Sequence, residues 1–183
     1  MNPYGQHDKL VRRCLQGERQ AQFELYQLYS KAMFNVCLRM LSDRVEAEDA
    51  LQNAFVDVYA KLPSFRFEST IGAWIKRIVV NKCINALKKK RVIFFEFQNN
   101  EPEAEIQDYS VDRNRSEEIA QIKSAIHQLP DGYRTIFSLY ALEGYDHQEI
   151  SQILDISIGT SKSQYSRAKQ RLCQLLEDKI YER

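Results

Sequence analysis

The chain has 183 residues, and its 26 basic and 25 acidic side chains give a formal net charge of +1. With so small a net charge, the chain cannot attract a polyanion through its total charge. Any nucleic-acid partner must therefore bind a local basic patch. Hydrophobic residues make up 44% of the chain, enough for one ordinary domain or two small ones. No apolar run approaches the ~20 residues of a membrane span and the first ten residues do not resemble a signal peptide, so we expect a cytoplasmic protein without membrane insertion.

Residues 8–42 carry apolar side chains at three- and four-residue spacing, which predicts two or three amphipathic helices. Asp43 can cap the next helix, and Glu46, three residues later, can complete a capping box. We expect this helix to end at Leu62, because Pro63 follows it.

The polar segment 64–69 predicts a loop, and Ser69 or Thr70 can cap a fourth long helix that ends in the basic run 88–91. The stretch 75–91 contains Lys and Arg but no acidic residue, which favours contact with nucleic acid. Aromatic rings in the loop lie beside cations, an arrangement that can stack unpaired bases for about 1 to 3 kcal/mol per base. Trp74 and Asn81 share one face of the helix, where the tryptophan fits a core position better than a DNA wedge.

Residues 92–112 contain Glu and Asp but no Lys or Arg, a composition typical of linkers. We therefore predict a flexible acidic linker over 92–115 between two domains, residues 1–91 and 116–183. The apolar segment VIFFEF within it could form a short strand, although we favour a hydrophobic hinge that docks on a neighbouring domain.

Helical periodicity returns over 117–129 and 133–143, with a break at 130–132, and Gly144 follows where a C-terminal cap belongs. Every segment except the linker is thus predicted to be helical. The fold class is all-α, with two small helical domains.

Residues 146–172 have the layout of a helix-turn-helix. Asp146 and Glu149 form a second capping box, the first helix breaks near Asp155, and Ser157 can cap a longer second helix. On this second helix the expected inward ridge consists of Tyr165, Ala168, Leu172 and Leu175.

The opposite face of this helix is expected to contact DNA. No acidic residue occurs between Asp155 and Glu177, whereas a merely solvated helix would normally mix Glu with Lys. Basic side chains neutralise phosphates, and hydroxyls or an Arg fork can also bind base edges. The candidate residues are Thr160, Lys162, Ser163, Ser166, Arg167, Lys169 and Arg171. A solvated basic face remains the alternative at this point.

The four cysteines, Cys14, Cys37, Cys83 and Cys173, stand far apart without a CxxC pair, which favours buried free thiols over a zinc site. We expect no metal and no cofactor. The sequence shows neither a nucleophile with a matching base nor a glycine-rich phosphate loop, so we expect a protein that is not an enzyme and has no small-molecule substrate.

Two blocks of the sequence resemble one family, the extracytoplasmic-function (ECF) class of bacterial sigma factors, which are promoter-recognition subunits of RNA polymerase. Residues 47–91, with AEDALQNAF and WIKRIVVN, are similar to the family's region 2. Residues 129–172, from LPDGYRTIF to SRAKQRL, are similar to region 4. The resemblance implies a sigma factor that binds RNA polymerase core and directs promoter recognition and DNA melting.

The resemblance also implies roles for individual residues. The residues at the positions that dock on the polymerase clamp helices are Asp49, Gln52, Asn53 and Phe55. The loop and helix expected to bind the minus-ten element, including the basic cluster, contribute Phe65, Arg66, Phe67, Glu68, Ser69, Thr70, Trp74, Lys76, Arg77, Asn81 and Lys88. The outer face of the last helix is expected to bind the minus-thirty-five element.

Three residues depart from the family pattern. Asn53 stands where an acidic residue is commoner, Asn85 where Asp is common, and Ser161 where an aliphatic residue is usual. The resemblance further implies an anti-sigma partner and an acidic linker that lies in a basic channel of the polymerase. Two other classes are a stand-alone dimeric helix-turn-helix regulator, which leaves the aromatic loop unexplained, and a small metalloenzyme, which the scattered His and Cys residues hardly favour.

Overall fold

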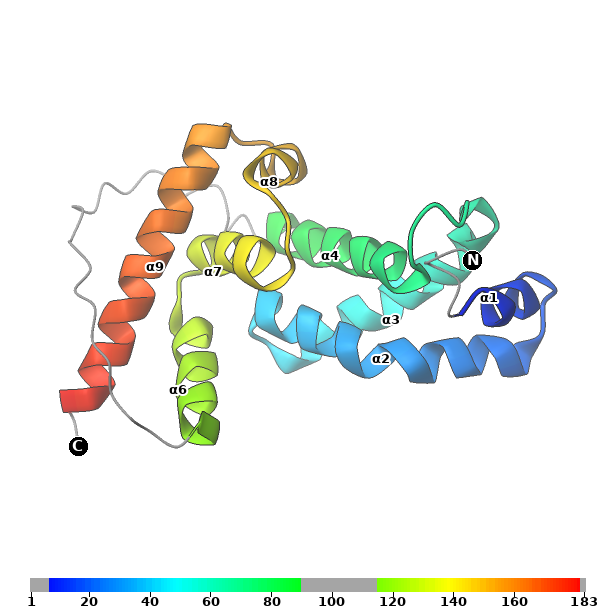
Figure 1. Cartoon of the computed structure of the whole chain (residues 1–183), viewed down its shortest axis with the longest axis horizontal. Helices are drawn as coiled ribbons and strands as arrows, with labels where there is room; N and C mark the ends of the chain where they lie inside the picture. The colour runs from blue at the N-terminus through cyan, green and yellow to red at the C-terminus, as the bar shows by residue number, and fades with distance from the viewer. Residues whose placement is uncertain (1–6, 90–114, 182–183) are drawn as a thin grey trace. The chain divides into compact units, whose positions relative to one another are not determined.

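A computed structural model of the protein describes residues 7–89 and 115–181. Each regular element in these two ranges is a helix, which confirms the predicted all-α fold. The chain divides into two compact units, unit 1 (residues 1–86) and unit 2 (residues 87–183) (Figure 1). The predicted linker, apart from its last residue, and its VIFFEF segment lie outside the described residues, as do Lys90 and Arg91.

Unit 1 is built from four α-helices and one short 3-10 turn among the residues described. They are α1 (Asp8–Leu15), α2 (Arg19–Leu41), α3 (Arg44–Lys61), the 3-10 turn η2 (Leu62–Ser64) and α4 (Ile71–Lys89), of which residues 87–89 fall in unit 2. Two helices therefore occupy residues 8–42, as the periodicity predicts.

Local capping explains where the long helices of unit 1 begin. The Asp43 carboxylate accepts a hydrogen bond from the Glu46 backbone N–H at 2.9 Å. Thr70, and not Ser69, caps α4, because its hydroxyl accepts from the Ala73 N–H at 3.2 Å. At the end of α3, Pro63 lies in the first turn of η2, a position that requires no proline N–H, so the chain tightens into a 3-10 turn before it enters the loop.

The core of unit 1 lies where α1 to α4 face one another. Val11, Leu25, Met40, Val58 and Ile75 are completely buried there. Cys14, Cys37 and Cys83 are buried free thiols, as predicted, while Cys173 in unit 2 is a half-buried free thiol.

Unit 2 contains the remaining helices. They are α6 (Arg115–Gln128), α7 (Asp131–Phe137), the π-helical turn η3 (Ser138–Leu142), α8 (His147–Leu154) and α9 (Ile158–Tyr181). The break after α6 is shorter than expected, because Pro130 occupies the N-cap and α7 begins at Asp131. Gly144 has a φ of +78°, the left-handed conformation predicted for the cap that follows these turns.

The core of unit 2 joins α6 and α7 to the C-terminal half of α9. Ala125, Ile126, Leu129, Tyr133, Ala168 and Leu172 form it, and Phe137, Leu175 and Leu176 pack against it. Ala168 and Leu172 therefore face inward, as the predicted ridge requires. This packing fixes which side of α9 is left for solvent or a partner.

Candidate nucleic-acid interface

The helix-turn-helix of unit 2 is held by reciprocal caps. The Glu149 N–H donates to the Asp146 carboxylate at 2.7 Å and the Asp146 N–H donates to the Glu149 carboxylate at 2.9 Å, which completes the predicted capping box. α8 ends at Asp155, whose φ of +58° turns the chain. Ser157 then caps α9 by accepting from the Thr160 N–H at 2.9 Å.

The outer face of α9 carries the predicted DNA-contacting residues. Lys162, Ser163, Ser166 and Arg171 are exposed, whereas Thr160, Arg167 and Lys169 are half-buried. The Lys169 ammonium lies 5.2 Å from the centre of the Tyr165 ring, within the range of a cation–π interaction, so this cation is placed at the edge of the outer face. Basic and hydroxyl groups thus line one side of a helix whose opposite side is packed.

Ser161 and Gln164 extend the buried ridge toward the start of α9, where they are 0% and 2% exposed. The polar Ser161 is accommodated because its hydroxyl lies 2.9 Å from Nδ1 of His147 on α8. A hydrogen bond thus replaces the apolar contact expected from an aliphatic residue, and the start of α9 remains tied to α8.

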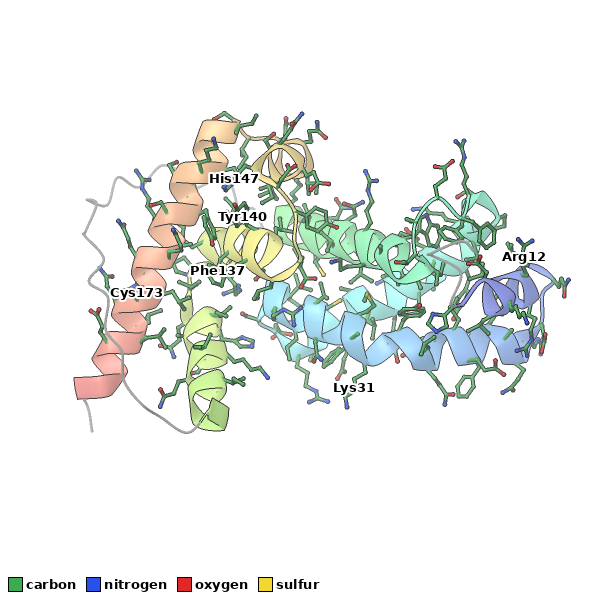
Figure 2. All side chains as sticks on the ribbon, in the orientation of Figure 1. Arg12, Lys31, Phe137, Tyr140, His147 and Cys173 are labelled. Carbon is green, nitrogen blue, oxygen red and sulfur yellow. The ribbon has the colours of Figure 1, made fainter. Side chains whose placement is uncertain are left out.

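The His147 ring belongs to a ring stack formed by Phe137, Tyr140, His147 and Tyr165. The Tyr140 ring lies 4.3 Å from the His147 ring at an interplanar angle of 18° and 4.5 Å from the Tyr165 ring, and Phe137 stacks on Tyr165 at 6.0 Å. Figure 2 labels Phe137, Tyr140 and His147. Burial lowers the pKa of His147, and the nearby Lys162 charge lowers it further. His147 is therefore a neutral partner in this packing, a role that the sequence did not indicate.

The loop before α4 is an aromatic cluster. The Phe65 ring lies 4.8 Å from the Phe67 ring and 5.4 Å from the Trp74 ring. Phe65 is only 7% exposed, so its ring packs mainly against neighbouring side chains, and its predicted part in minus-ten binding stays a prediction. Phe67 and Ser69 are half-buried, and Arg66, Glu68 and Thr70 are exposed.

The face of α4 beyond the loop holds the second group of predicted residues. Arg77 and Asn81 are exposed, and Trp74, Lys76 and Lys88 are half-buried. Lys82, although part of the basic stretch, forms an ion pair with Asp57 on α3 at 3.0 Å. Hydrogen bonds from Lys61 and then Lys82 lower the pKa of Asp57, so this cation is engaged in joining α3 to α4.

α3 presents a polar stripe on its exposed side. Asp49, Gln52 and Asn53 are exposed, and the Asn53 amide donates to the Asp49 carbonyl at 2.8 Å. Val45 and Val56 flank them and are each 67% exposed. These valines share the stripe's three- and four-residue spacing, a signal that the sequence reasoning missed.

Phe55 is directed away from this stripe and into the core. It is 3% exposed and packs against Tyr26 and Tyr59, with ring centres 4.8 and 6.2 Å away. Of the four residues predicted to dock on the polymerase, Phe55 is therefore the buried one, and its place in that set stays a prediction.

Within the described ranges, no helix is both long enough and apolar enough to cross a membrane. The same part of the chain brings no three His, Cys, Asp or Glu side chains together in a geometry that fits a metal ion.

Comparison with known proteins identifies the family. The family model for Sigma-70 region 2 matches residues 25–92, and the one for Sigma-70 region 4 matches residues 119–172. The ECF RNA polymerase sigma-E factor of Escherichia coli K12 is 30% identical over 173 residues, which cover 89% of this chain and 90% of the relative. This chain belongs to the ECF sigma factors.

Other relatives agree with this assignment. The ECF sigma factor SigW of Bacillus subtilis is 28% identical over 180 residues, covering 93% of this chain and 96% of the relative. The fold is similar to that of the sigma factor RpoE from Bartonella quintana, solved in complex with the anti-sigma factor NepR, with a TM-score of 0.55 and 24% identity over 84% of this chain and 95% of that one. It is also similar to CnrH, solved in complex with the cytosolic domain of CnrY, with a TM-score of 0.54 and 21% identity over 92% of this chain and 96% of that one.

Membership of the family confirms the predicted function at the level of the whole chain. The protein is a sigma factor that binds RNA polymerase and directs transcription initiation at promoters, and it is not an enzyme.

Proposed function

We propose that the two units of this sigma factor bind the same promoter at separate elements. Unit 2 binds the duplex minus-thirty-five element through the outer face of α9, while unit 1 captures an unpaired base of the minus-ten element and docks on the polymerase. The observation that carries this proposal is the two-sided character of α9. We assign residues 1–91 and 116–183 to the two functions and residues 92–115 to the linker between them.

The contacts proposed for unit 2 follow from the chemistry of the α9 face. Lys162, Lys169 and Arg171 carry charges that neutralise phosphates, and the Arg167 guanidinium has the geometry for two hydrogen bonds to a guanine edge. Thr160, Ser163 and Ser166 add hydroxyls that accept or donate at the DNA backbone or at bases. The ring stack beneath the helix supports the orientation of these groups.

The contacts proposed for unit 1 centre on the half-buried Phe67 and Trp74. Phe67 is the aromatic residue of the loop that is partly open to solvent. The buried Phe65 ring packs against it. Arg66, Arg77 and Asn81 are exposed along the path that leads from the loop onto α4 and are available to an unpaired strand. Opening each base step costs a few kcal/mol. We therefore propose that the protein opens DNA only when it is bound to the polymerase.

The polymerase surface that we propose is the stripe on α3. Asp49, Gln52 and Asn53 provide polar contacts, and the exposed Val45 and Val56 provide apolar area at its two ends. A polar stripe with exposed apolar side chains at its ends is more typical of a surface that binds a partner helix than of one that faces only water. We further propose that the protein acts in the cytoplasm, where it meets polymerase and DNA, and that an anti-sigma factor regulates it, as the complexes of two fold relatives suggest.

The test uses purified polymerase core, the full-length protein and a random promoter library. Arg167→Ala should weaken binding to a selected promoter by about 1 to 3 kcal/mol and relax the base preference at one position if the guanidinium contacts a base edge. Loss of a phosphate contact alone would instead weaken binding to all sequences equally and reduce the salt slope by about one.

A second variant separates docking from DNA binding. Asn53→Lys should weaken binding to the polymerase core and leave duplex binding of the free protein unchanged. A stand-alone dimeric regulator would bind duplex DNA without a stoichiometric complex with the core enzyme, so a pull-down that recovers no core would reject the proposal.

A further inference from the structure

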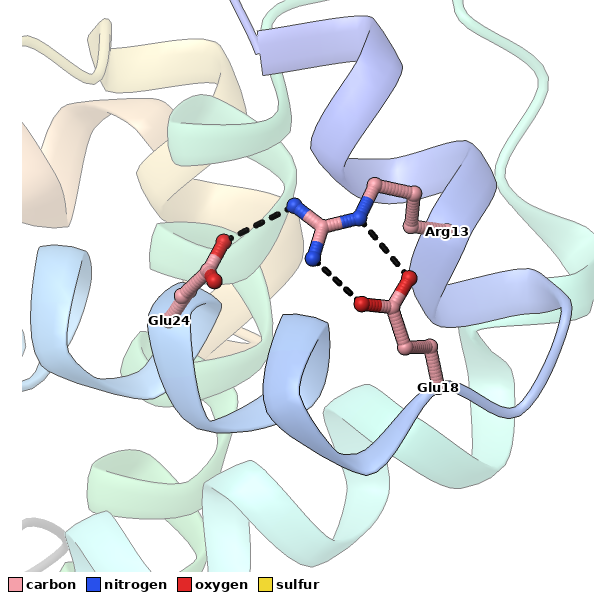
Figure 3. A network of polar contacts seen from close by, with 3 residues as sticks. All are labelled: Arg13, Glu18 and Glu24. Atoms are coloured by element: carbon pink, nitrogen blue, oxygen red, sulfur yellow. Dashed lines mark hydrogen bonds and ion pairs between the residues drawn. The ribbon is translucent and has the colours of Figure 1, made fainter.

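α1 is fixed firmly to the rest of unit 1. The Arg13 guanidinium donates to the Glu18 carboxylate through Nε at 2.8 Å and also through Nη2, and it donates to Glu24 on α2 at 3.0 Å (Figure 3). The hydrogen bond from Arg13 lowers the pKa of Glu18. On the inner side of α1, Val11 and Cys14 are buried. The position of α1 relative to α2 is therefore fixed, and with it the position of the side chains on the outer side of α1.

The start of α1 is linked to the start of α4. Nδ1 of His7 lies 2.8 Å from the Tyr29 hydroxyl, and the two rings meet edge to face. The Tyr29 ring in turn lies against Gly72, where an added Cβ would come within 2.9 Å of a ring carbon. Gly72 is the second residue of α4, directly after the aromatic loop, so this chain of contacts supports the end of the loop.

A second contact reaches the loop itself. The Arg12 guanidinium carbon lies 5.0 Å from the centre of the Phe67 ring, within the range of a cation–π interaction (Figure 2 labels Arg12 on α1). Phe67 has a φ of +58°, a left-handed conformation that is unusual for a bulky side chain and persists only where its surroundings hold it. The described contacts of this ring include Phe65 and Arg12.

We propose that Arg12 is a positioning residue for minus-ten recognition, which it supports by holding Phe67 in its left-handed conformation. The proposal rests on the assignment of residues 65–70 to base capture. It gives α1 a function beyond packing, because α1 supports the loop at Phe67 and at the start of α4. Arg12 acts through the ring and not through a phosphate of its own.

A double-mutant cycle tests this role. The variants are Arg12→Ala, Phe67→Leu and the double variant, each as full-length protein bound to polymerase core, with Lys9→Ala as the control that removes an exposed charge from the same helix. The DNA is a promoter selected by the wild-type holoenzyme and offered with its minus-ten strands mismatched, so that the base is already unpaired. Measured quantities are affinity for this template, its salt slope, affinity for core and the thermal unfolding of the free protein.

Arg12→Ala should reduce affinity for the pre-opened template about two- to fivefold, the factor that corresponds to one cation–π contact at an exposed site. In the Phe67→Leu background, the same substitution should cause no further loss, because the ring through which Arg12 acts is gone. The salt slope and core affinity should match those of wild type, the unfolding transition should shift by no more than the loss of this one contact, and Lys9→Ala should match wild type throughout.

Three results would overturn the proposal. Equal losses from Arg12→Ala in both backgrounds, with a lower salt slope, would show a direct phosphate contact. Parallel losses in core affinity and unfolding would show a purely structural role, and wild-type affinity for the template would show no role. If instead the wild-type holoenzyme does not prefer the pre-opened template to closed duplex, the assignment of the loop itself fails, which is a distinct outcome.

Discussion

Loss of the hydrogen bond between Ser161 and His147 should lower stability by different amounts, depending on which of the two residues is substituted. Ser161 is completely buried and His147 is half-buried, with 2.9 Å between Oγ and Nδ1. Ser161→Ala removes one bond and leaves the unpaired nitrogen on the less buried of the two residues, so we expect a loss of about 1 kcal/mol in the free energy of unfolding.

His147→Ala should cost more, because it leaves the Ser161 hydroxyl buried without that partner and removes the ring stacked on Tyr140. An unsatisfied buried hydroxyl costs about 1 to 3 kcal/mol and a stacked pair contributes about 0.5 to 1.5 kcal/mol, which predicts about 1.5 to 4.5 kcal/mol in total. The double variant should lose less than the sum of the single losses, since it contains no orphaned hydroxyl.

Urea unfolding of the full-length variants measures these differences. Far-ultraviolet circular dichroism reports both units, while fluorescence of Trp74, the single tryptophan, reports unit 1 and serves as an internal reference. Gln148→Ala, a change at an exposed position next to His147, is the matched control. If His147→Ala costs no more than Ser161→Ala, burial of the serine hydroxyl does not determine the cost of losing this bond.

Three further predictions concern packing and pH. Arg134 is 3% exposed and donates to the Leu129 carbonyl at 2.7 Å and to the Asp131 carboxylate, so Arg134→Met should lower the free energy of unfolding by about 2 to 4 kcal/mol, and an equally stable variant in urea would contradict this. Gly72→Ala should cost about 1 to 2 kcal/mol despite its better helix propensity, because the new methyl displaces the Tyr29 ring; a thermal scan in which the variant is as stable as wild type would count against that contact. The folded-state pKa of His147 lies below its ordinary value near 6.5, so the contribution of this residue to stability is present above pH 6.5 and falls as the pH drops below that value. His147→Asn should flatten this decline when urea midpoints are measured against pH. An unchanged slope would show that His147 does not cause the decline.

Signals that act over a few residues were predictable from the sequence. Asp43, Thr70, Asp146 and Ser157 all cap helices as expected, because a cap requires only a side-chain oxygen and a backbone N–H three residues away. Periodicity likewise predicted the inward ridge of α9. These features determine the helix-turn-helix and therefore most of the fold of unit 2.

Features that depend on distant parts of the chain were not predictable in the same way. Phe65 lies in a loop, where no helical period indicates which rings turn inward, and its burial depends on Trp74 in the next helix. The contact of Arg12 with Phe67 joins segments that only the packing of α1 brings together. His147 gave no signal as the partner of Ser161, since their pairing requires the turn between α8 and α9 to be known.

The π-helical turn η3 makes the packing of unit 2 sensitive to the number of residues in the segment 138–142. Its Glu143 N–H bonds to the Ser138 carbonyl at 2.9 Å, a span one residue wider than in an α-helix. Deletion of one residue from 138–142 would remove the extra residue of this wider turn and so change how the Tyr140 ring lies against His147. An insertion or deletion here would therefore change the support of α9 even though no residue of α9 had changed.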